Sequence, residues 1–146
     1  MTTLSLGTAL RQLPRGRLDM VPYARLLDLS FDQSQGEARL LMPFAERLVG
    51  APGRLHGGAI AGLLEIAGVA AVVRAMPEDE KLPRLRPVTV TVDYLRAGQT
   101  IDTYAAAEVT RLGRRVINVV SRAWQADRAR PIASAHLNFL VDWPEG

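Results

Sequence analysis

The sequence lacks cysteine altogether, and it contains only two histidines among its 146 residues. A chain without thiols forms no disulfide and no thiolate metal site, so a reducing compartment suits it and we expect a cytoplasmic protein. Two histidines without cysteine also argue against a metal centre. We therefore expect chemistry that needs neither a metal nor a cofactor.

Lysine is almost absent, because Lys81 is the only lysine among the 18 basic residues, and the net charge is only +3. The arginines are scattered and form no basic helix, which makes nucleic acid the least favoured partner. The amino terminus lacks the basic segment and sustained apolar core of a signal peptide. The glycine-rich residues 51–58 lack the Gly-Lys-Ser/Thr ending of a nucleotide phosphate loop.

Charge is also missing from residues 55–73, where Glu65 is the only charged side chain and His56 the only other ionisable one. The run is long enough to raise the question of a membrane span. Its four glycines and central carboxylate favour instead a helix buried on nearly all sides, and we expect no membrane partner. We place this helix from about Ala59 to Met76, stopped by Pro77.

Strands are predicted on both sides of this helix. Residues 25–32 and 37–42 alternate around a polar turn and predict a hairpin, whereas residues 1–20 show only a weak helical pattern and form a lead-in. After the helix, alternation predicts four strands in a meander. These strands cover residues 87–94, 100–111, 115–125 and 132–142. We expect one domain over residues 1–146, of class α+β, with an antiparallel sheet wrapped around one long central helix.

Gly57 and Gly58 precede the expected helix and leave its first amides accessible. Those amides lack an acceptor within the helix and carry the positive end of its dipole, which is an oxyanion-hole arrangement. Glu65 follows about two turns later, where an unpaired buried carboxylate is costly and therefore indicates a use. His56 and Glu65 are half a revolution apart at helical spacing. Either His56 lies outside the helix, or the two features serve different copies of the site, which indicates an oligomer.

Three further stretches accompany the His-Gly-Gly motif and the acid nine positions after its histidine. They are P-V-T-V-T-V-D-Y-L-R-A, R-P-I-A-S-A-H-L-N-F-L-V and L-D-L-S-F-D-Q-S-Q-G-E-A-R-L-L-M-P. Together they resemble the hotdog-fold acyl-CoA thioesterases of the phenylacetate-catabolic and 4-hydroxybenzoyl-CoA type, over roughly residues 20–142. The resemblance implies hydrolysis of an acyl-CoA thioester to a free acid and coenzyme A.

The resemblance also implies a homodimer or a dimer of dimers, with active sites at the interface. Glu65 is then the catalytic carboxylate, which activates water or attacks the thioester carbonyl itself. The Gly57 amide, from the partner subunit, polarises that carbonyl, and His56 supports the loop. Gly58 and Arg96 are candidate substrate-binding residues, Arg96 because arginine suits the phosphates of coenzyme A.

Plainer interpretations exist for these residues. Glu65 is alternatively a helix carboxylate with a structural partner, the two glycines a tight start to the helix, and Arg96 a solvated turn residue like Arg111, Arg114 and Arg115. His136 shares a strand face with Asn138, which favours a hydrogen-bonded sheet histidine.

The sequence departs from the pattern of the resembled family at two positions. Gly50 stands six residues before His56, where the family usually has Asn or Gln, and Pro87 stands seven residues before Tyr94, where Ser or Thr is common. Loss of an oxyanion donor typically costs on the order of a hundredfold in rate. These departures support an alternative function, a non-catalytic hotdog module that binds acyl-CoA or a lipid. A hydratase is less favoured, because no second acid-base residue accompanies a histidine on one loop.

Overall fold

The structure, a computed structural model, describes residues 5–78 and 81–144. The described residues form one long helix, α3 (Gly57–Ala75), between a group of short elements and a group of long strands. The short elements are α1 (Leu6–Gln12), β1 (Arg15–Arg17), α2 (Pro22–Leu26), β2 (Ser30–Asp32), β3 (Arg39–Met42) and the 3₁₀ turn η1 (Glu46–Leu48). The long strands are β4 (Arg84–Tyr94), β5 (Thr103–Leu112), β6 (Val116–Trp124) and β7 (Ala133–Asp142).

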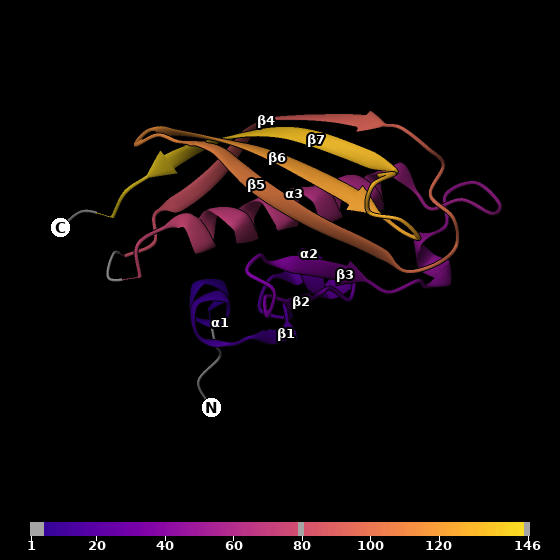
Figure 1. Cartoon of the computed structure of the whole chain (residues 1–146), viewed down its shortest axis with the longest axis horizontal. Coiled ribbons are helices and arrows are strands. Elements are labelled where there is room, and N and C mark those ends of the chain that lie inside the picture. The colour runs from indigo at the N-terminus through magenta and orange to yellow at the C-terminus, as the bar shows by residue number, and fades with distance from the viewer. Residues whose placement is uncertain (1–4, 79–80, 145–146) are drawn as a thin grey trace.

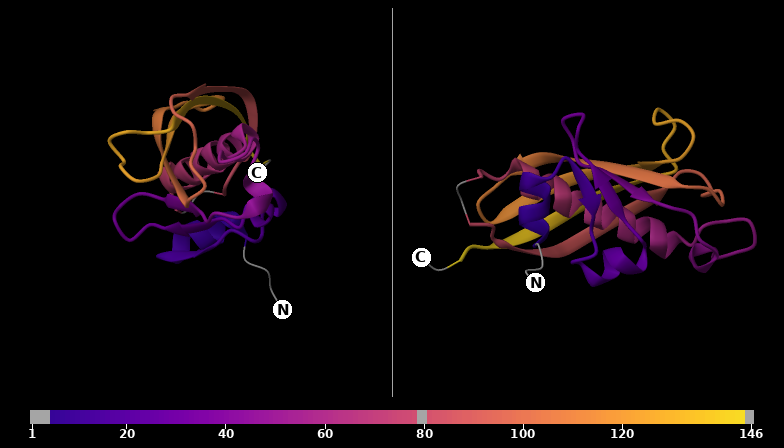
Figure 2. Two further views of the ribbon diagram at one scale, coloured as in Figure 1. Left: turned by 90° about the vertical axis from the view of Figure 1, so that its right-hand side faces the viewer. Right: turned by 90° about the horizontal axis from the view of Figure 1, so that it is seen from below.

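The described strands form one 7-stranded antiparallel sheet in the order β1-β2-β3-β5-β6-β7-β4. Strands β4 to β7 curve over one side of α3, and the segment from α1 to β3 lies on the other side (Figures 1 and 2). This arrangement confirms the predicted α+β class, with an antiparallel sheet around one long central helix.

Helix α3 is buried because small and apolar residues let the sheet approach it closely. Leu63, Leu64 and Ala67 are 0% exposed. Gly68 lies against the sheet, where an added Cβ would lie 3.1 Å from Leu137 Cδ1. By length and composition α3 is apolar enough to cross a membrane, with a mean hydropathy of 1.7, but 61% of it is buried inside the fold. Its apolar length is therefore explained by the core that it forms.

Three boundaries before β4 differ from the sequence prediction. Helix α3 begins at Gly57, two residues before Ala59, because His56 caps it there. Of the predicted strand 25–32 only residues 30–32 form β2. Residues 25–26 belong to helix α2, since Pro22 at the first helical position favours a helical turn. The lead-in contains α1, where a weak helical pattern was noted, and also β1, which pairs with β2 and was not predicted. Leu4, part of that pattern, lies outside the described residues.

The predicted meander is wrong at β4, which pairs with β7 instead of β5. Strand β5 pairs with β3, so the strands that follow it fill the space over α3 and leave β4 at the far edge. Strand β4 also begins three residues earlier than predicted and has a bulge between Pro87 and Thr89. Beyond the bulge, Val90 and Tyr94 face the helix side, opposite Leu137 and Ala133, as their alternation predicted.

Candidate functional site

The first turn of helix α3 is held by side chains from its own loop and from β4. His56 is the N-cap, and its Nδ1 accepts a hydrogen bond from the Gly58 N–H at 2.9 Å. His56 therefore lies outside the helix, which was the first of the two alternatives. Its own backbone N–H donates to Leu48 O at 2.7 Å. From β4, the Tyr94 hydroxyl donates to Gly57 O at 2.9 Å.

Among the first four amides of α3, only the Gly57 N–H makes no hydrogen bond with the described part of the chain. The Gly58 N–H is taken by His56, and those of Ala59 and Ile60 reach His56 O at 3.1 and 3.3 Å. The accessible pair of amides expected at this point is therefore a single amide. An unpaired N–H at the positive end of a helix attracts an oxygen that carries negative charge.

Gly57 lines an open pocket of about 320 Å³ between the helix start and the turn that follows β4. The helix side also contributes Ile60, the end of β4 contributes Tyr94, and the turn contributes Arg96. The two walls are tied together, because the Leu55 N–H donates to Gly98 O at 3.0 Å. The structure thus brings together Gly57 and Arg96, two of the predicted site residues, in one pocket.

Glu65 does not line this pocket. It lies eight residues after Gly57, about 12 Å further along the helix axis at 1.5 Å per residue. It is partly buried on a strip of α3 with Ala61 and Val69, which the fold also leaves partly uncovered. Glu65 has no hydrogen-bond or ion-pair partner in the described part of the chain, so the plainer interpretation of a structural pair finds no partner there. Gly57 and Glu65 therefore do not line one pocket of this chain.

Strand β4 is a free edge of the sheet, since only β7 pairs with it among the described strands. Val88 and Val90 are 53% and 41% exposed on it. Val90 lies on the helix side of the sheet. The helix-side face of the sheet at β4 is therefore apolar, and α3 does not cover it fully. A long apolar edge is usually paired or covered.

The two positions that depart from the resembled family lie in different surroundings. Gly50 lies against His56, where an added Cβ would be 3.0 Å from His56 Cα and 3.3 Å from its Cδ2. Pro87 is exposed on β4, opposite Phe139 and beside the bulge.

The other arginines of interest and His136 lie away from the pocket. Arg111 lies near the end of β5, and Arg114 and Arg115 lie in the turn between β5 and β6. This turn is at the opposite end of the sheet from the start of α3 (Figure 1). His136 is exposed, and Asn138 accepts a hydrogen bond from Asn118 at 2.5 Å instead. The hydrogen-bonded histidine that the shared strand face favoured is therefore not found in the described part of the chain.

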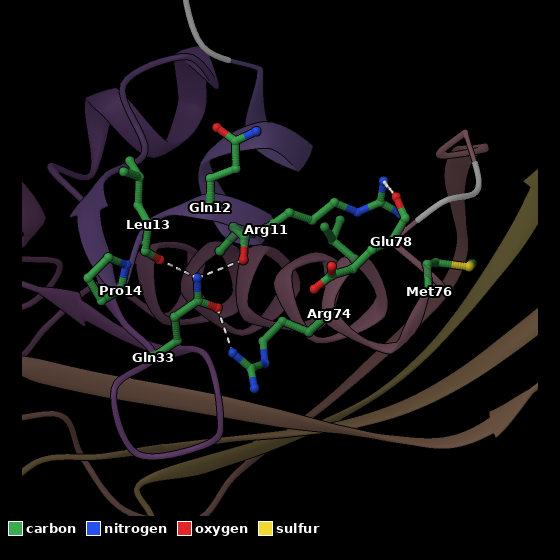
Figure 3. Close-up of a pocket in the computed structure, with 10 residues that line it drawn as sticks. Arg11, Gln12, Leu13, Pro14, Gln33, Arg74, Met76 and Glu78 are labelled. Atoms are coloured by element: carbon green, nitrogen blue, oxygen red, sulfur yellow. Dashed lines mark hydrogen bonds between the residues drawn. The ribbon is translucent and has the colours of Figure 1, made fainter.

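A second hollow, of about 390 Å³, lies at the C-terminal end of α3 (Figure 3). There Gln33 donates to Leu10 O and Leu13 O at 2.6 and 2.5 Å and accepts from Arg74 at 2.7 Å. Arg11 donates to two backbone carbonyls just after the helix. The polar groups of this hollow thus bind one another and hold α1 to the end of α3.

Tyr94 stood in the sequence only as part of a strand motif, and its contribution at the helix start was not predicted. Its hydroxyl holds the first carbonyl of α3, and its ring lies on Gly57, where an added Cβ would be 3.2 Å from Tyr94 Oη. The alternation that put Tyr94 on the helix side of β4 was the available signal. The distance between β4 and the helix start was not available from the sequence.

Comparisons with known proteins show the family and the fold. The sequence model of the acyl-CoA thioesterase N-terminal domain matches residues 48–140. A Halobacterium salinarum protein named as an esterase is 37% identical over 103 residues, which is 66% of this chain and 67% of that protein. A phenylacetic acid degradation-related protein from Ralstonia eutropha has the same fold, at 22% identity and a TM-score of 0.73 over 93% of this chain and 98% of its own. A Bacillus halodurans protein solved with CoA has it at 19% identity and a TM-score of 0.69, over 84% and 78%. The predicted hotdog fold and the resemblance to thioesterases are thereby confirmed.

Proposed function

The chain belongs to the acyl-CoA thioesterase family, and from this premise we propose that it hydrolyses an acyl-CoA thioester to a free acid and coenzyme A. The observation that carries the proposal is the Gly57 N–H, which is unpaired in the described part of the chain on a helix whose only carboxylate, Glu65, is also unpaired. A hydrogen-bond donor can stabilise the charge that develops on the thioester oxygen, and a carboxylate can act as the base or the nucleophile.

In the proposed reaction, either a water molecule deprotonated by Glu65 or the Glu65 carboxylate itself adds to the thioester carbonyl carbon. The carbonyl oxygen gains negative charge and accepts a hydrogen bond from the Gly57 N–H. The carbon–sulfur bond then breaks, and coenzyme A leaves as a thiolate that takes up a proton. If Glu65 attacks directly, water hydrolyses the resulting anhydride and releases the acid.

We propose further that Gly57 and Glu65 of one site come from two copies of the chain. The separation of about 12 Å along α3 supports this, because the carbonyl group must lie within hydrogen-bond distance of the Gly57 N–H and within reach of Glu65, directly or through one water molecule. The free edge of β4, with Val88 and Val90 exposed, supports an antiparallel joining of two copies there. Such a dimer, alone or in a dimer of dimers, would cover the apolar face at β4.

The coenzyme A part of the substrate is proposed to lie over Arg54 and Arg96. Both arginines line the pocket of Gly57, and both are exposed. Guanidinium groups suit phosphate oxygens by geometry and charge. The Bacillus halodurans protein with CoA supports a ligand of this class.

The test of the function is release of free thiol from a panel of acyl-CoAs with aliphatic and aromatic acyl groups. Glu65→Ala should lower kcat/KM by about a hundredfold or more, the usual contribution of an acid-base residue. Glu65→Gln keeps the shape of the side chain and should lose as much. Glu108→Gln, an exposed carboxylate on β5, is the matched control and should match the wild type. Full activity in Glu65→Ala would overturn the assignment.

A second candidate function is binding of acyl-CoA without turnover. It is favoured by Gly50, which offers no side-chain donor beside the helix start. Stoichiometric binding of acyl-CoA by calorimetry, with no thiol released over the whole panel, would select this function over hydrolysis.

A further inference from the structure

The peptide group between Gly57 and Gly58 is held at both ends. Its carbonyl accepts the Tyr94 hydroxyl at 2.9 Å, and its N–H donates to His56 Nδ1 at 2.9 Å. Because the peptide group is planar, these two contacts fix its orientation. The neighbouring N–H, that of Gly57, is then the one left to face a ligand.

We propose that Tyr94 is a positioning residue for the Gly57 amide and that Gly50 leaves room for His56 to cap the same helix start. Both roles rest on the proposed thioesterase function. Tyr94 touches the helix start through its hydroxyl and through its ring, which lies on the methylene of Gly57. It is 54% exposed, so the core does not hold it there. Its side chain is held instead by its contacts with Gly57 at the helix start.

Tyr94 also sets the distance between the helix start and the edge strand. It is the last residue of β4, the strand at which a second copy is proposed to join. A fixed contact from this strand to Gly57 therefore fixes the Gly57 N–H relative to the carboxylate of the other copy. Misplacement by about 1 Å can cost a hundredfold in rate, which makes such a contact important for catalysis.

Gly50 acts from the other side of His56. Its loop is closed by the Gly50 N–H on Arg54 O at 3.0 Å and by the pairing of Val49 with Leu55. A Cβ at position 50 would lie 3.0 Å from His56 Cα and 3.3 Å from its Cβ. His56 would have to shift by a few tenths of an ångström to admit it, which would strain the hydrogen bond that its Nδ1 accepts from Gly58. The absence of a side chain at position 50 thus lets the His56 cap form without this shift.

The first test is Tyr94→Phe, which keeps the ring and removes the hydroxyl. We expect kcat to fall by about tenfold, as for the loss of one well-placed hydrogen bond, with KM within about twofold of the wild type. Amide hydrogen exchange at Gly58 should become faster, because the peptide group loses one of its two contacts. Tyr104→Phe is the matched control, since the Tyr104 hydroxyl has no hydrogen bond in the described part of the chain and lies on β5 against Trp124. It should change neither readout.

The second test is Gly50→Ala, with Ala51→Ser at the exposed neighbouring position as its control. Gly50→Ala should lower kcat and speed exchange at Gly58, and Ala51→Ser should do neither. Two results with an active wild type would overturn the inference while the proposed function stands. One is a wild-type kcat in Tyr94→Phe, and the other is an equal fall in kcat in Tyr94→Phe and Tyr104→Phe. If the wild type hydrolyses no acyl-CoA, the proposed function fails and the positioning role fails with it.

Discussion

At the C-terminal end of helix α3, side chains from distant segments close over the last turn, whereas its N-terminal end keeps one amide, the Gly57 N–H, without a partner in the described part of the chain. Arg11 donates to Pro77 O and Glu78 O at 2.8 and 3.2 Å, and Gln33 joins Arg74 to α1 (Figure 3). At the other end, the Gly57 N–H is unpaired and lines a pocket.

The difference separates what holds the fold from what is free to bind. Nearly all buried polar backbone groups in proteins are paired, so closing the C-terminal end contributes to stability. A helix start with an unpaired N–H gives up that contribution and retains the capacity to bind an anionic oxygen. Substitutions at the closed end should therefore change the free energy of unfolding, and substitutions at the open end should change the rate of the reaction.

The largest effect is expected when the two proposed groups of the site, Gly57 and Glu65, are removed in separate copies of the chain. Glu65→Ala and Gly57→Val should each be inactive alone, the second because an added Cβ would lie 3.2 Å from Tyr94 Oη. Coexpressed with different affinity tags and purified through both, the two variants should form a heterodimer with about half of the wild-type activity, since one of its two sites keeps both groups. Thiol release measures this recovery.

The control for this experiment is a Glu65→Ala dimer whose two copies carry the two different tags. This dimer should stay inactive. A mixed heterodimer without activity would show that each site is built from one chain, against the shared-site proposal. Failure of the two tagged chains to copurify, or a wild type that sediments as a monomer at micromolar concentration, would contradict the dimer.

The closed end should respond in stability alone. Gln33→Ala removes two hydrogen bonds to the carbonyls of Leu10 and Leu13 and one from Arg74, so we expect the free energy of unfolding to fall by about 2 kcal/mol. Urea unfolding followed by circular dichroism measures this loss. Gln35→Ala, at an exposed turn position two residues later, should leave stability unchanged. A drop in kcat for Gln33→Ala without a drop in stability would contradict the contrast between the two ends.

The sequence predicted the open end better than the closed one, and the reason is physical. His56, Gly57 and Glu65 lie within ten residues of one another, so helical spacing was enough to relate them. The contacts of Gln33 with α1 and Arg74 join segments 20 to 41 residues apart, and no local pattern reports them. The pairing of β4 with β7 was missed for the same reason, because alternation identifies a strand and its faces but not its neighbour.

The smallest effect is expected for an ion pair that lies at neither end of α3, that of Glu37 with Arg128. Arg128 donates to Glu37 Oε1 at 2.7 Å and lies over the Trp124 ring, 4.4 Å from its centroid. The hydrogen bond from Arg128 lowers the pKa of Glu37 below its usual value, and burial opposes this in part. A lowered pKa in the folded state means that the pair stabilises the protein at neutral pH and that this stabilisation is lost as the pH falls through the folded-state pKa.

Glu37→Gln should therefore lower the free energy of unfolding by about 1 kcal/mol at pH 7, a modest value because the side chain is 30% exposed. The difference from the wild type should shrink as the pH falls through the lowered folded-state pKa of Glu37, because the wild-type carboxylate then takes up a proton. Urea unfolding at several pH values measures it, with Glu108→Gln as the control, since Glu108 has no ion pair in the described part of the chain. Thioesterase activity at pH 7 should not change, because Glu37 lies at neither end of α3. Equal stability of Glu37→Gln and the wild type at pH 7 would contradict the contribution of the ion pair and leave the contact of Arg128 with Trp124 as its remaining role.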